Sequence, residues 1–430
     1  MTGDDGVTNP GLTRQNTGIK PARDRRGAVS HDRQEWRVRD LQAPRAAAPT
    51  WRPTRGALMQ RTIDNMRIGG HAMRYSQFVP RLYNYCLSLG FERDRMMPSR
   101  AFCSDESQGY PVVLIALHFG TFPFDHGRVG GKVAINRHGP HAHHGEDLVI
   151  IQASHVGYDA ESRRFGVYQR QRTAGREFGD NCGKLCAVLH WYQDEYRHAG
   201  EGVLCGRIDG EPAVFIDNQY LDEKRPEALL LHLDRLIQQA DDPLKVLSTS
   251  RAFRAAPSLV ERLPAEMWRD KPVAIGAHLT PDLFGFRRTP TEGLEGHDIL
   301  EAALAPAMPA LVTSAHPPLD AARYTTQVEF DRTYRSILRE PTYRNKNVLF
   351  VSGVNIDISP SDGLPFPLTK FVPWAAYASL RDGRSFLLEQ DELTETLRRQ
   401  STDNPHRFSL DSSIREMTDA EEITFETHQI

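Results

Sequence analysis

Three side chains of the types that bind zinc occur in three separate segments of the chain. Cys103 lies in FCSDES, His155 directly follows the apolar run DLVIIQAS, and Cys182 lies in GDNCGKL. Thiolate sulfur and imidazole nitrogen are common zinc donors, and three protein ligands leave a fourth position for water or substrate. The set therefore predicts a catalytic zinc site rather than a closed structural one.

A carboxylate lies next to the first of these ligands. In an extended chain the side chains of residues i and i+2 point the same way, so Asp105 shares a face with Cys103. A thiolate and a carboxylate repel each other unless a cation lies between or beside them. With zinc present, Asp105 is placed to accept a hydrogen bond from zinc-bound water, and we expect it to be catalytic.

The remaining cysteines and two further histidines have other predicted roles. Cys86, Cys186 and Cys205 stand in apolar contexts and are predicted to be buried packing thiols. His126 is a rival for the zinc-ligand role of His155, and His118 is predicted to be satisfied by a backbone group. Five cysteines, an odd number, favour a reducing compartment over a disulfide framework.

A dense group of histidines, HGPHAHHGED, spans residues 138–147. Histidine-rich tracts can bind metal, and imidazoles titrate near neutral pH, so a second metal site or a proton shuttle at a pocket mouth is an open interpretation. A metal-dependent hydrolase is the corresponding function, and its ligands would be His141, His143, His144 and Asp147.

Strands that alternate with helices predict an α/β fold with a mostly parallel central sheet flanked by helices. Strands are predicted over residues 111–120, 147–154, 271–277, 309–315 and 347–354. Helices are predicted from about residue 57 up to the first strand (two helices), and over residues 183–199, 226–239, 298–305, 327–340, 374–380 and 391–400. Ligands collect at the carboxyl ends of parallel strands, where His155 is expected.

The composition changes along the chain and sets the expected organisation. Residues 1–56 are basic and poor in aliphatic side chains, which predicts a mobile arm. An α/β domain over 57–385 and a C-terminal helix with a polar tail over 386–430 follow. A net charge of −3 is too near neutral for a protein that binds nucleic acid through its whole surface.

The N-terminus and the apolar runs indicate where the protein is located. No apolar run approaches the roughly 20 residues that cross a bilayer. The N-terminus has no signal-peptide pattern, and Asp4 and Asp5 argue against an organelle transit peptide. We therefore expect a cytoplasmic protein without a membrane span.

Several longer phrases resemble one known family. LIALHFGTFPFDHG, LVIIQASHVGYD, GDNCGKLCAVLHWY, LVTSAHPPLDAARYTTQVEFDR and LFVSGVNIDISP are similar to the limiting-CO2-inducible protein B/C family, a divergent group of β-type carbonic anhydrases also linked to the theta class. The resemblance covers roughly residues 57–385. It implies a β-carbonic-anhydrase-like fold, Zn²⁺ on Cys103, His155 and Cys182, and a homodimer or higher homo-oligomer with active sites near the subunit interface.

The resemblance also implies an activity, the reversible hydration of CO2 to bicarbonate by zinc-bound hydroxide. Ordinary β-class enzymes carry an arginine two residues after the motif aspartate, where this chain has Ser107. That arginine pairs with the aspartate and keeps it off the metal. Arg163 and Arg164, or else Arg176, are predicted to substitute for it.

An inactive protein is the alternative that the serine leaves open. Without a paired arginine, Asp105 could ligate zinc and close the site. The protein would then be a catalytically inactive, zinc-stabilised subunit that binds partners or bicarbonate in inorganic-carbon handling.

Overall fold

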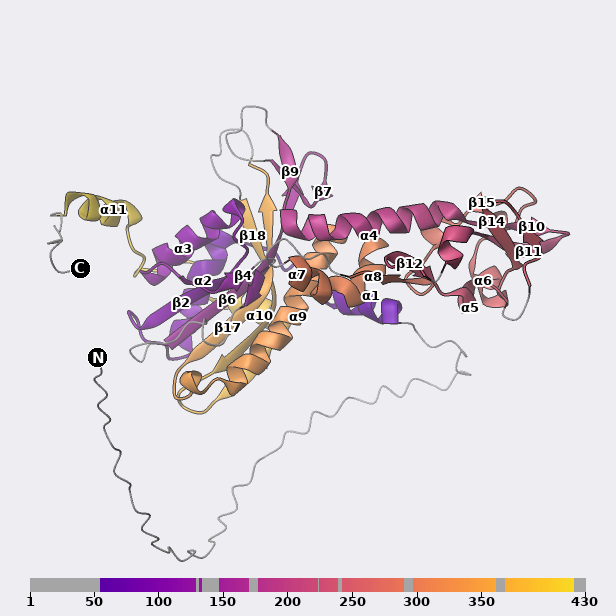
Figure 1. The fold of residues 1–430 in the computed structure, drawn as a ribbon. Helices are drawn as coiled ribbons and strands as arrows, with labels where there is room; N and C mark the ends of the chain where they lie inside the picture. Colours follow the sequence, from indigo (N-terminus) through magenta and orange to yellow (C-terminus); the bar gives the residue numbers. More distant parts are fainter. Residues whose placement is uncertain are drawn as a thin grey trace, which may run out of the picture. The chain divides into compact units, whose positions relative to one another are not determined.

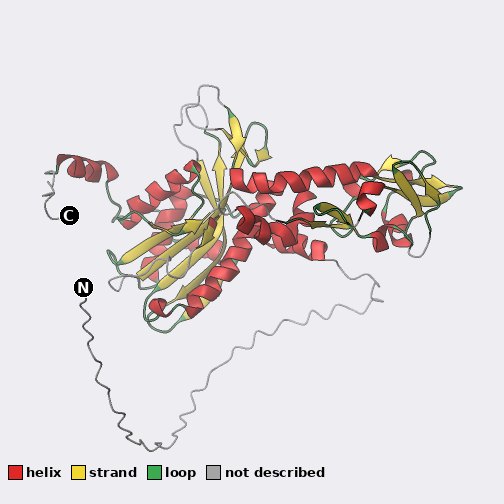
Figure 2. Ribbon diagram, in the orientation of Figure 1, coloured by secondary structure: helices red, strands yellow, loops and turns green. Residues whose placement is uncertain are grey.

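The computed structural model describes residues 55–128, 131–133, 147–169, 177–222, 224–238, 242–289, 297–360 and 368–420. The predicted arm over residues 1–56 lies almost entirely outside them. Helices and strands of the described residues form a mixed α/β fold (Figure 1; Figure 2 separates helices from strands by colour).

The larger sheet has eight strands in the order β1-β18-β17-β6-β2-β3, with β19 beside β18 and β7 beside β6. The strands are β1 (Met73–Arg74), β2 (Met96–Ala101), β3 (Phe124–Asp125), β6 (Asp147–Asp159), β7 (Arg164–Phe165), β17 (Val348–Ile358), β18 (Leu368–Ser379) and β19 (Ser385–Leu388). The central strands β17, β6, β2 and β3 are parallel, and the outer pairings are antiparallel. This confirms the predicted mostly parallel central sheet.

Helices cover both faces of this sheet. They are α1 (Arg55–Asn65), α2 (Tyr75–Ser88), α3 (Gly109–Phe119), α9 (Pro317–Arg339) and α10 (Gln390–Arg399). Alternate side chains of a strand point to opposite faces, so Val149 and Ile151 pack in the cluster formed with α2, α3 and α10, while Leu148 and Ile150 pack in the cluster that contains Ile337 of α9. The first halves of β6 and β17 are therefore continuous apolar runs, as expected for parallel strands that are buried on both faces.

A second sheet follows the long helix α4 (Gly183–Gly202). Its order is β13-β14-β11-β10-β15, and all its pairs are antiparallel. The strands are β10 (Val203–Ile208), β11 (Glu211–Asp217), β13 (Lys245–Val246), β14 (Ser250–Arg254) and β15 (Val273–Ala274). Nothing in the sequence analysis predicted this antiparallel sheet.

Smaller elements complete the described chain. The short strand pairs are β4 (Gly127–Arg128) with β5 (Lys132–Val133), β8 (Val167–Gln169) with β9 (Phe178–Asp180), and β12 (Ala228–Leu231) with β16 (Phe284–Arg287). The remaining helices are α5 (Leu233–Leu236), α6 (Pro257–Arg262), α7 (His297–Leu304), α8 (Met308–Val312) and α11 (Leu410–Asp419). The 3₁₀ turns are η1 (Glu106–Gln108), η4 (Asn218–Leu221), η5 (Ala265–Met267), η6 (Gly276–His278), η7 (Ala305–Ala307) and η8 (Pro341–Tyr343).

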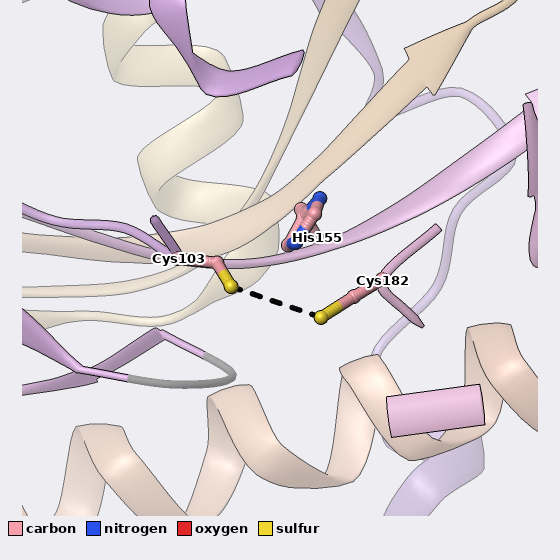
Figure 3. Close-up of side chains that lie close together, drawn as sticks. All are labelled: Cys103, His155 and Cys182. Atoms are coloured by element: carbon pink, nitrogen blue, oxygen red, sulfur yellow. Dashed lines mark hydrogen bonds between the residues drawn. The ribbon is translucent and has the colours of Figure 1, made fainter. Parts of the chain in front are cut away.

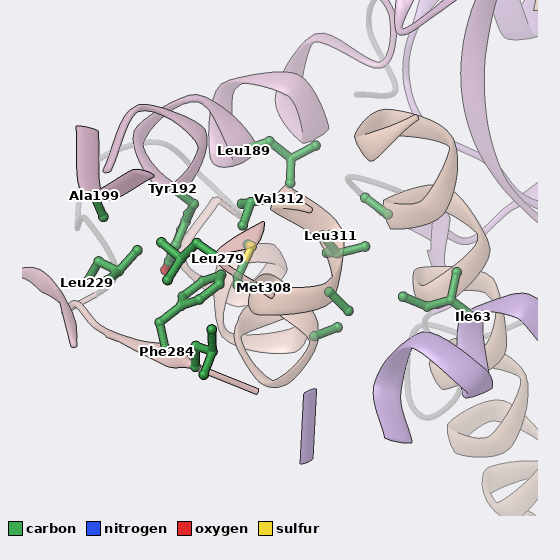
Figure 4. Packing of buried hydrophobic residues seen from close by; sticks show 14 of the residues in the cluster. Ile63, Leu189, Tyr192, Ala199, Leu229, Leu279, Phe284, Met308, Leu311 and Val312 are labelled. Carbon is green, nitrogen blue, oxygen red and sulfur yellow. The ribbon is translucent and has the colours of Figure 1, made fainter. Parts of the chain in front are cut away.

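One apolar core joins α4 to the elements around it. Leu189 and Tyr192 of α4 belong to the same buried cluster as Phe284 of β16 and Met308 and Leu311 of α8 (Figure 4). Cys182 and Cys103 belong to this cluster too, so the core that holds α4 in place extends to the predicted ligands.

The predicted elements were partly right. The strands at 147–154 and 347–354 and the helices at 183–199, 298–305, 327–340 and 391–400 are confirmed, as are two helices near the start. Of the strand predicted at 271–277, only β15 is a strand in the structure. Four predictions are wrong. Residues 111–120 overlap helix α3, residues 309–315 overlap helix α8, residues 374–380 overlap strand β18, and residues 226–239 contain β12 and α5. Short apolar runs do not reveal by periodicity whether they are helix or strand.

None of the helices in the described residues combines the length and the apolar character required to cross a bilayer.

Candidate metal centre

The three predicted ligands lie together although they come from three different elements. Cys103 follows β2, His155 is part of β6, and Cys182 is the N-cap residue of α4 (Figure 3). The two Sγ atoms are 3.8 Å apart, and one ligand atom from each residue lies within 4.8 Å of the other two. All three side chains are buried, with exposed fractions of 4%, 1% and 1%.

The parallel pairing of β2 with β6 brings the first two ligands together. Ala101, the last residue of β2, pairs with Gln152 of β6. Cys103 is two residues beyond Ala101 and His155 is three residues beyond Gln152, so the parallel pairing places them near each other. His155 lies inside β6, which runs to Asp159, and not after the strand as predicted. The third ligand arrives from the β9–α4 junction, where Gly157 N–H donates to the carbonyl of Asn181 at 2.8 Å.

The imidazole of His155 is oriented by a carboxylate that the sequence analysis did not identify. Nδ1 lies 2.9 Å from Oδ2 of Asp357 on β17, and both side chains are fully buried. A carboxylate accepts, so Nδ1 carries the proton and Nε2 presents its lone pair. Nε2 is buried and has no hydrogen-bond partner among the described residues. An unpartnered imidazole nitrogen beside two thiols fits a zinc ion.

Asp357 has four donors around its two oxygens. Oδ2 accepts from Ser107 Oγ at 2.8 Å and Gln108 Nε2 at 2.8 Å as well as from His155, and Oδ1 accepts from Thr369 Oγ1 at 3.1 Å. Burial raises the pKa of Asp357, although the hydrogen bond from His155 opposes that rise. Thus the carboxylate is well satisfied despite its burial.

The predicted ligands shift one another's pKa values. Burial works to lower the pKa of His155, but the neighbouring Cys182 thiolate and Asp357 raise it, and the net direction is upward. The hydrogen bond with Cys103 and burial raise the pKa of Cys182. Bringing two thiolates this close needs a compensating positive charge, and metal binding supplies it while releasing the thiol protons.

Asp105 lies at the edge of the group and is not one of the clustered donors. It caps η1, where its Oδ1 accepts from Ser107 N–H at 3.1 Å and from Asn181 Nδ2 at 3.4 Å. Its carboxylate is absent from the set of donors within 4.8 Å. In the described part of the chain, no further cysteine, histidine or carboxylate therefore belongs to the group.

The two arginines predicted to pair with Asp105 lie elsewhere. Arg163 and Arg164 are exposed at the turn into β7, where they line a surface pocket together with Asp180, His190 and His316. Neither forms an ion pair with Asp105 in the described ranges. The third candidate, Arg176, is outside the described residues.

The rival histidines do not join the metal group. His126 is buried after β3, its ring stacks near Phe124 with centroids 6.3 Å apart, and it is not one of the clustered donors. The ring of His118 is contacted by the side-chain amide of Asn404, not by a backbone group as predicted. Burial of Cys86, Cys186 and Cys205 is confirmed.

The histidine cluster at 138–144, including His141, His143 and His144, is outside the described residues. Asp147, its predicted carboxylate partner, is buried at the start of β6. Its two oxygens bind Arg381 at 2.8 Å and Asn347 Nδ2 at 2.8 Å. This carboxylate therefore serves to join β6 to the neighbouring turns.

One signal in the sequence could have identified Asp357. The run NVLFVSGVNIDIS is apolar except near its end, where Asn355 and Asp357 occupy alternate positions on one face of the strand. Buried polar groups at the carboxyl end of a parallel strand are expected to bind something. Their pairing with His155 depends on β17 lying beside β6, which the sequence does not reveal.

Comparison with known proteins gives structural neighbours only. No family model matches the chain, and no curated protein matches it. The chain is similar in structure to PtLCIB4, a homolog of the limiting CO2-inducible protein LCIB, with 12% identity, a TM-score of 0.43, and coverage of 74% of this chain and 95% of that one. It is similar to LCIB itself with 13% identity, a TM-score of 0.39, and coverage of 77% and 98%.

Proposed function

We propose that the protein is a zinc-dependent carbonic anhydrase that converts CO2 and water reversibly to bicarbonate and a proton. The observation that carries the proposal is the buried group of two thiols and one imidazole, with His155 Nε2 free of hydrogen bonds in the described structure. Structural zinc sites take four protein ligands, whereas catalytic sites take three. Three ligands favour catalysis.

Cys103, His155 and Cys182 would hold the zinc ion. When bound, zinc acts as a Lewis acid and makes water nucleophilic near neutral pH, which is the chemistry that CO2 hydration requires. Asp357 holds the His155 imidazole through Nδ1, so Nε2 would bind the zinc ion with little reorganisation.

The protein residues around the group would select and orient the reactants. The burial of all three donors restricts access to small molecules, and CO2 is small and uncharged. Oδ1 of Asp105 accepts from Ser107 N–H and from Asn181 Nδ2, so Oδ2 would be the oxygen that accepts a hydrogen bond from the reacting water. Such an acceptor would orient the water towards CO2.

A catalytically inactive, zinc-stabilised binding subunit is the second candidate. It is favoured by one observation, the absence of an ion pair between Asp105 and any arginine in the described residues. Against it, Ser107 N–H and Asn181 Nδ2 already hold the Asp105 carboxylate on the turn. Backbone and amide donors can restrain a carboxylate without an arginine.

Stopped-flow CO2 hydration separates the two candidates. We expect zinc-loaded protein to accelerate hydration, and we expect a chelator that removes zinc to abolish the acceleration, with zinc restoring it. Protein that carries one zinc per chain and gives no acceleration between pH 6 and 9 would establish the inactive subunit.

A further inference from the structure

We propose that Ser107 is a positioning residue that ties the three ligand-bearing segments of the metal centre to one another. The inference rests on the metal site of the proposed function, but not on CO2 as the substrate. It assigns a role to the position where ordinary β-class enzymes carry arginine.

The hydroxyl of Ser107 reaches the His155 segment through Asp357. Ser107 Oγ donates to Asp357 Oδ2 at 2.8 Å, the same oxygen that accepts from His155 Nδ1 at 2.9 Å. The two donors thus meet on one atom. Any shift of the Ser107 turn moves the carboxylate that sets the direction of the imidazole.

The same hydroxyl reaches the Cys182 segment through Asn181. Asn181 Nδ2 donates to Ser107 Oγ at 3.1 Å, and Asn181 immediately precedes Cys182 at the start of α4. Gln108 Nε2 also lies 3.2 Å from Ser107 Oγ. A hydroxyl has one hydrogen to donate and two lone pairs, so these contacts use its full capacity.

The backbone of Ser107 reaches the Cys103 segment. Its N–H donates to Asp105 Oδ1 at 3.1 Å, which fixes the turn two residues after Cys103. Ser107, which is only 1% exposed, therefore contacts a partner beside each of the three predicted ligands, two of them through its hydroxyl and one through its backbone N–H. Ser107 thus joins Asp105, Asp357 and Asn181 through direct hydrogen bonds.

Thr369 provides a matched contrast. Its Oγ1 also donates to Asp357, at 3.1 Å, and the residue is 2% exposed. It binds the other oxygen, Oδ1, and no hydrogen bond links it to Asn181 or Asp105 among the described residues. Removing either hydroxyl deletes one buried hydrogen bond to the same carboxylate, but only Ser107→Ala also disconnects the Asn181 contact.

The experiment compares Ser107→Ala with Thr369→Val in the full-length chain. Zinc affinity is measured by competition with a chromophoric chelator, and the Co²⁺-substituted proteins are examined for the thiolate-to-cobalt charge-transfer band. We expect Ser107→Ala to weaken zinc binding 10- to 100-fold, roughly the range for lost outer-shell partners, and to alter the cobalt band. We expect Thr369→Val to change zinc affinity less than about threefold, because the Asn181 and His155 contacts remain.

Circular dichroism of the zinc-free variants checks that both fold. If Ser107→Ala does not fold, Asn181→Ala tests the same connection from the Cys182 side, and we expect it to weaken zinc binding more than Thr369→Val does. Equal zinc affinities and equal cobalt spectra for the serine and threonine variants would overturn the positioning role.

The outcome is separable from that of the proposed function. Wild-type protein that binds zinc tightly without hydrating CO2 refutes the activity, while the comparison of variants still decides the role of Ser107. Wild-type protein that binds no zinc overturns both.

Discussion

The two sheets of the protein differ in the side chains that they bury. The strands of the larger sheet bury His155, Asn355 and Asp357 in addition to their apolar residues. The described strands of the second sheet bury apolar side chains such as Cys205, Val214 and Ile216, and no buried polar side chain is found on them.

The difference follows from how the strands are paired. In the larger sheet β17, β6 and β2 run in the same direction, so their carboxyl ends and the loops that follow meet at one edge. In the second sheet neighbouring strands run in opposite directions, so no edge collects the ends of all of them. The buried polar side chains of the candidate metal centre therefore gather at the larger sheet, and the described strands of the second sheet have none.

The largest effect on zinc binding is expected when either cysteine of the candidate metal centre is replaced. Cys103→Ser and Cys182→Ser should each abolish stable zinc binding and activity, because a hydroxyl is a poor zinc ligand compared with a thiolate. Cys205→Ser, in the second sheet, is the matched control, and it should keep its zinc. Metal content after dialysis measures both, and full zinc occupancy in Cys103→Ser would disprove the ligand assignment.

The next largest effect, on turnover, is expected when Asp105 beside the three predicted ligands is replaced. Asp105→Asn should keep zinc but reduce turnover roughly 10- to 100-fold, because the amide can present a donor where the water needs an acceptor. Stopped-flow kinetics and metal analysis of the same sample measure the two quantities. An unchanged rate would exclude Asp105 from the reaction, and a loss of zinc affinity would show that the carboxylate occupies the fourth position on the metal.

The ligands were predictable from the sequence as a set, not as single residues. Cys103 and His155 are weak signals alone, but together with Cys182 and the family resemblance they predicted a zinc site, and the structure brings the three together. Asp357 and Ser107 were not predictable, because their role depends on β17 lying beside β6 and on the turn after Cys103. Both are facts of tertiary structure.

The wrong element predictions have two physical causes. The run at 111–120 is apolar on all sides, so it gives no periodicity, and the structure makes it α3 with Gly120 in the left-handed conformation at its C-terminus (φ 77°). The segment 374–380 contains alanines that favour helix, yet it pairs along β17 as part of β18. Tertiary pairing overrides a weak local preference.

Acid should destabilise the protein through histidines that flank the larger sheet. Burial lowers the pKa of His118 to about 4 and that of His126 to about 3. A histidine whose folded-state pKa is lowered stabilises the fold above its unfolded pKa of about 6.5, and this stability is lost as the pH falls towards the folded value. The free energy of unfolding should therefore decrease from pH 7 to pH 4.5.

Urea denaturation at several pH values measures this loss. His118→Gln should show a weaker pH dependence than the wild type, while His198→Gln, at an exposed position on α4, should match the wild type. A wild-type free energy of unfolding that stays constant between pH 7 and 4.5 would contradict the burial of neutral histidines.

The smallest effect is expected from the second sheet. Ile216→Val removes one buried methylene group from β11 and should lower the free energy of unfolding by about 0.5–1.5 kcal/mol. Zinc stoichiometry and turnover should not change, because no predicted ligand lies on this sheet. A parallel loss of zinc would show that the two sheets are coupled at the metal centre.

X-ray absorption at the zinc edge tests the central claim most directly, namely that two thiolates and one imidazole hold the metal and leave one position open. The account predicts two sulfur neighbours at about 2.3 Å and two nitrogen or oxygen neighbours at about 2.0–2.1 Å. It also predicts that Asp105→Asn leaves this shell unchanged. A shell without sulfur, or one that loses an oxygen neighbour in Asp105→Asn, would contradict it.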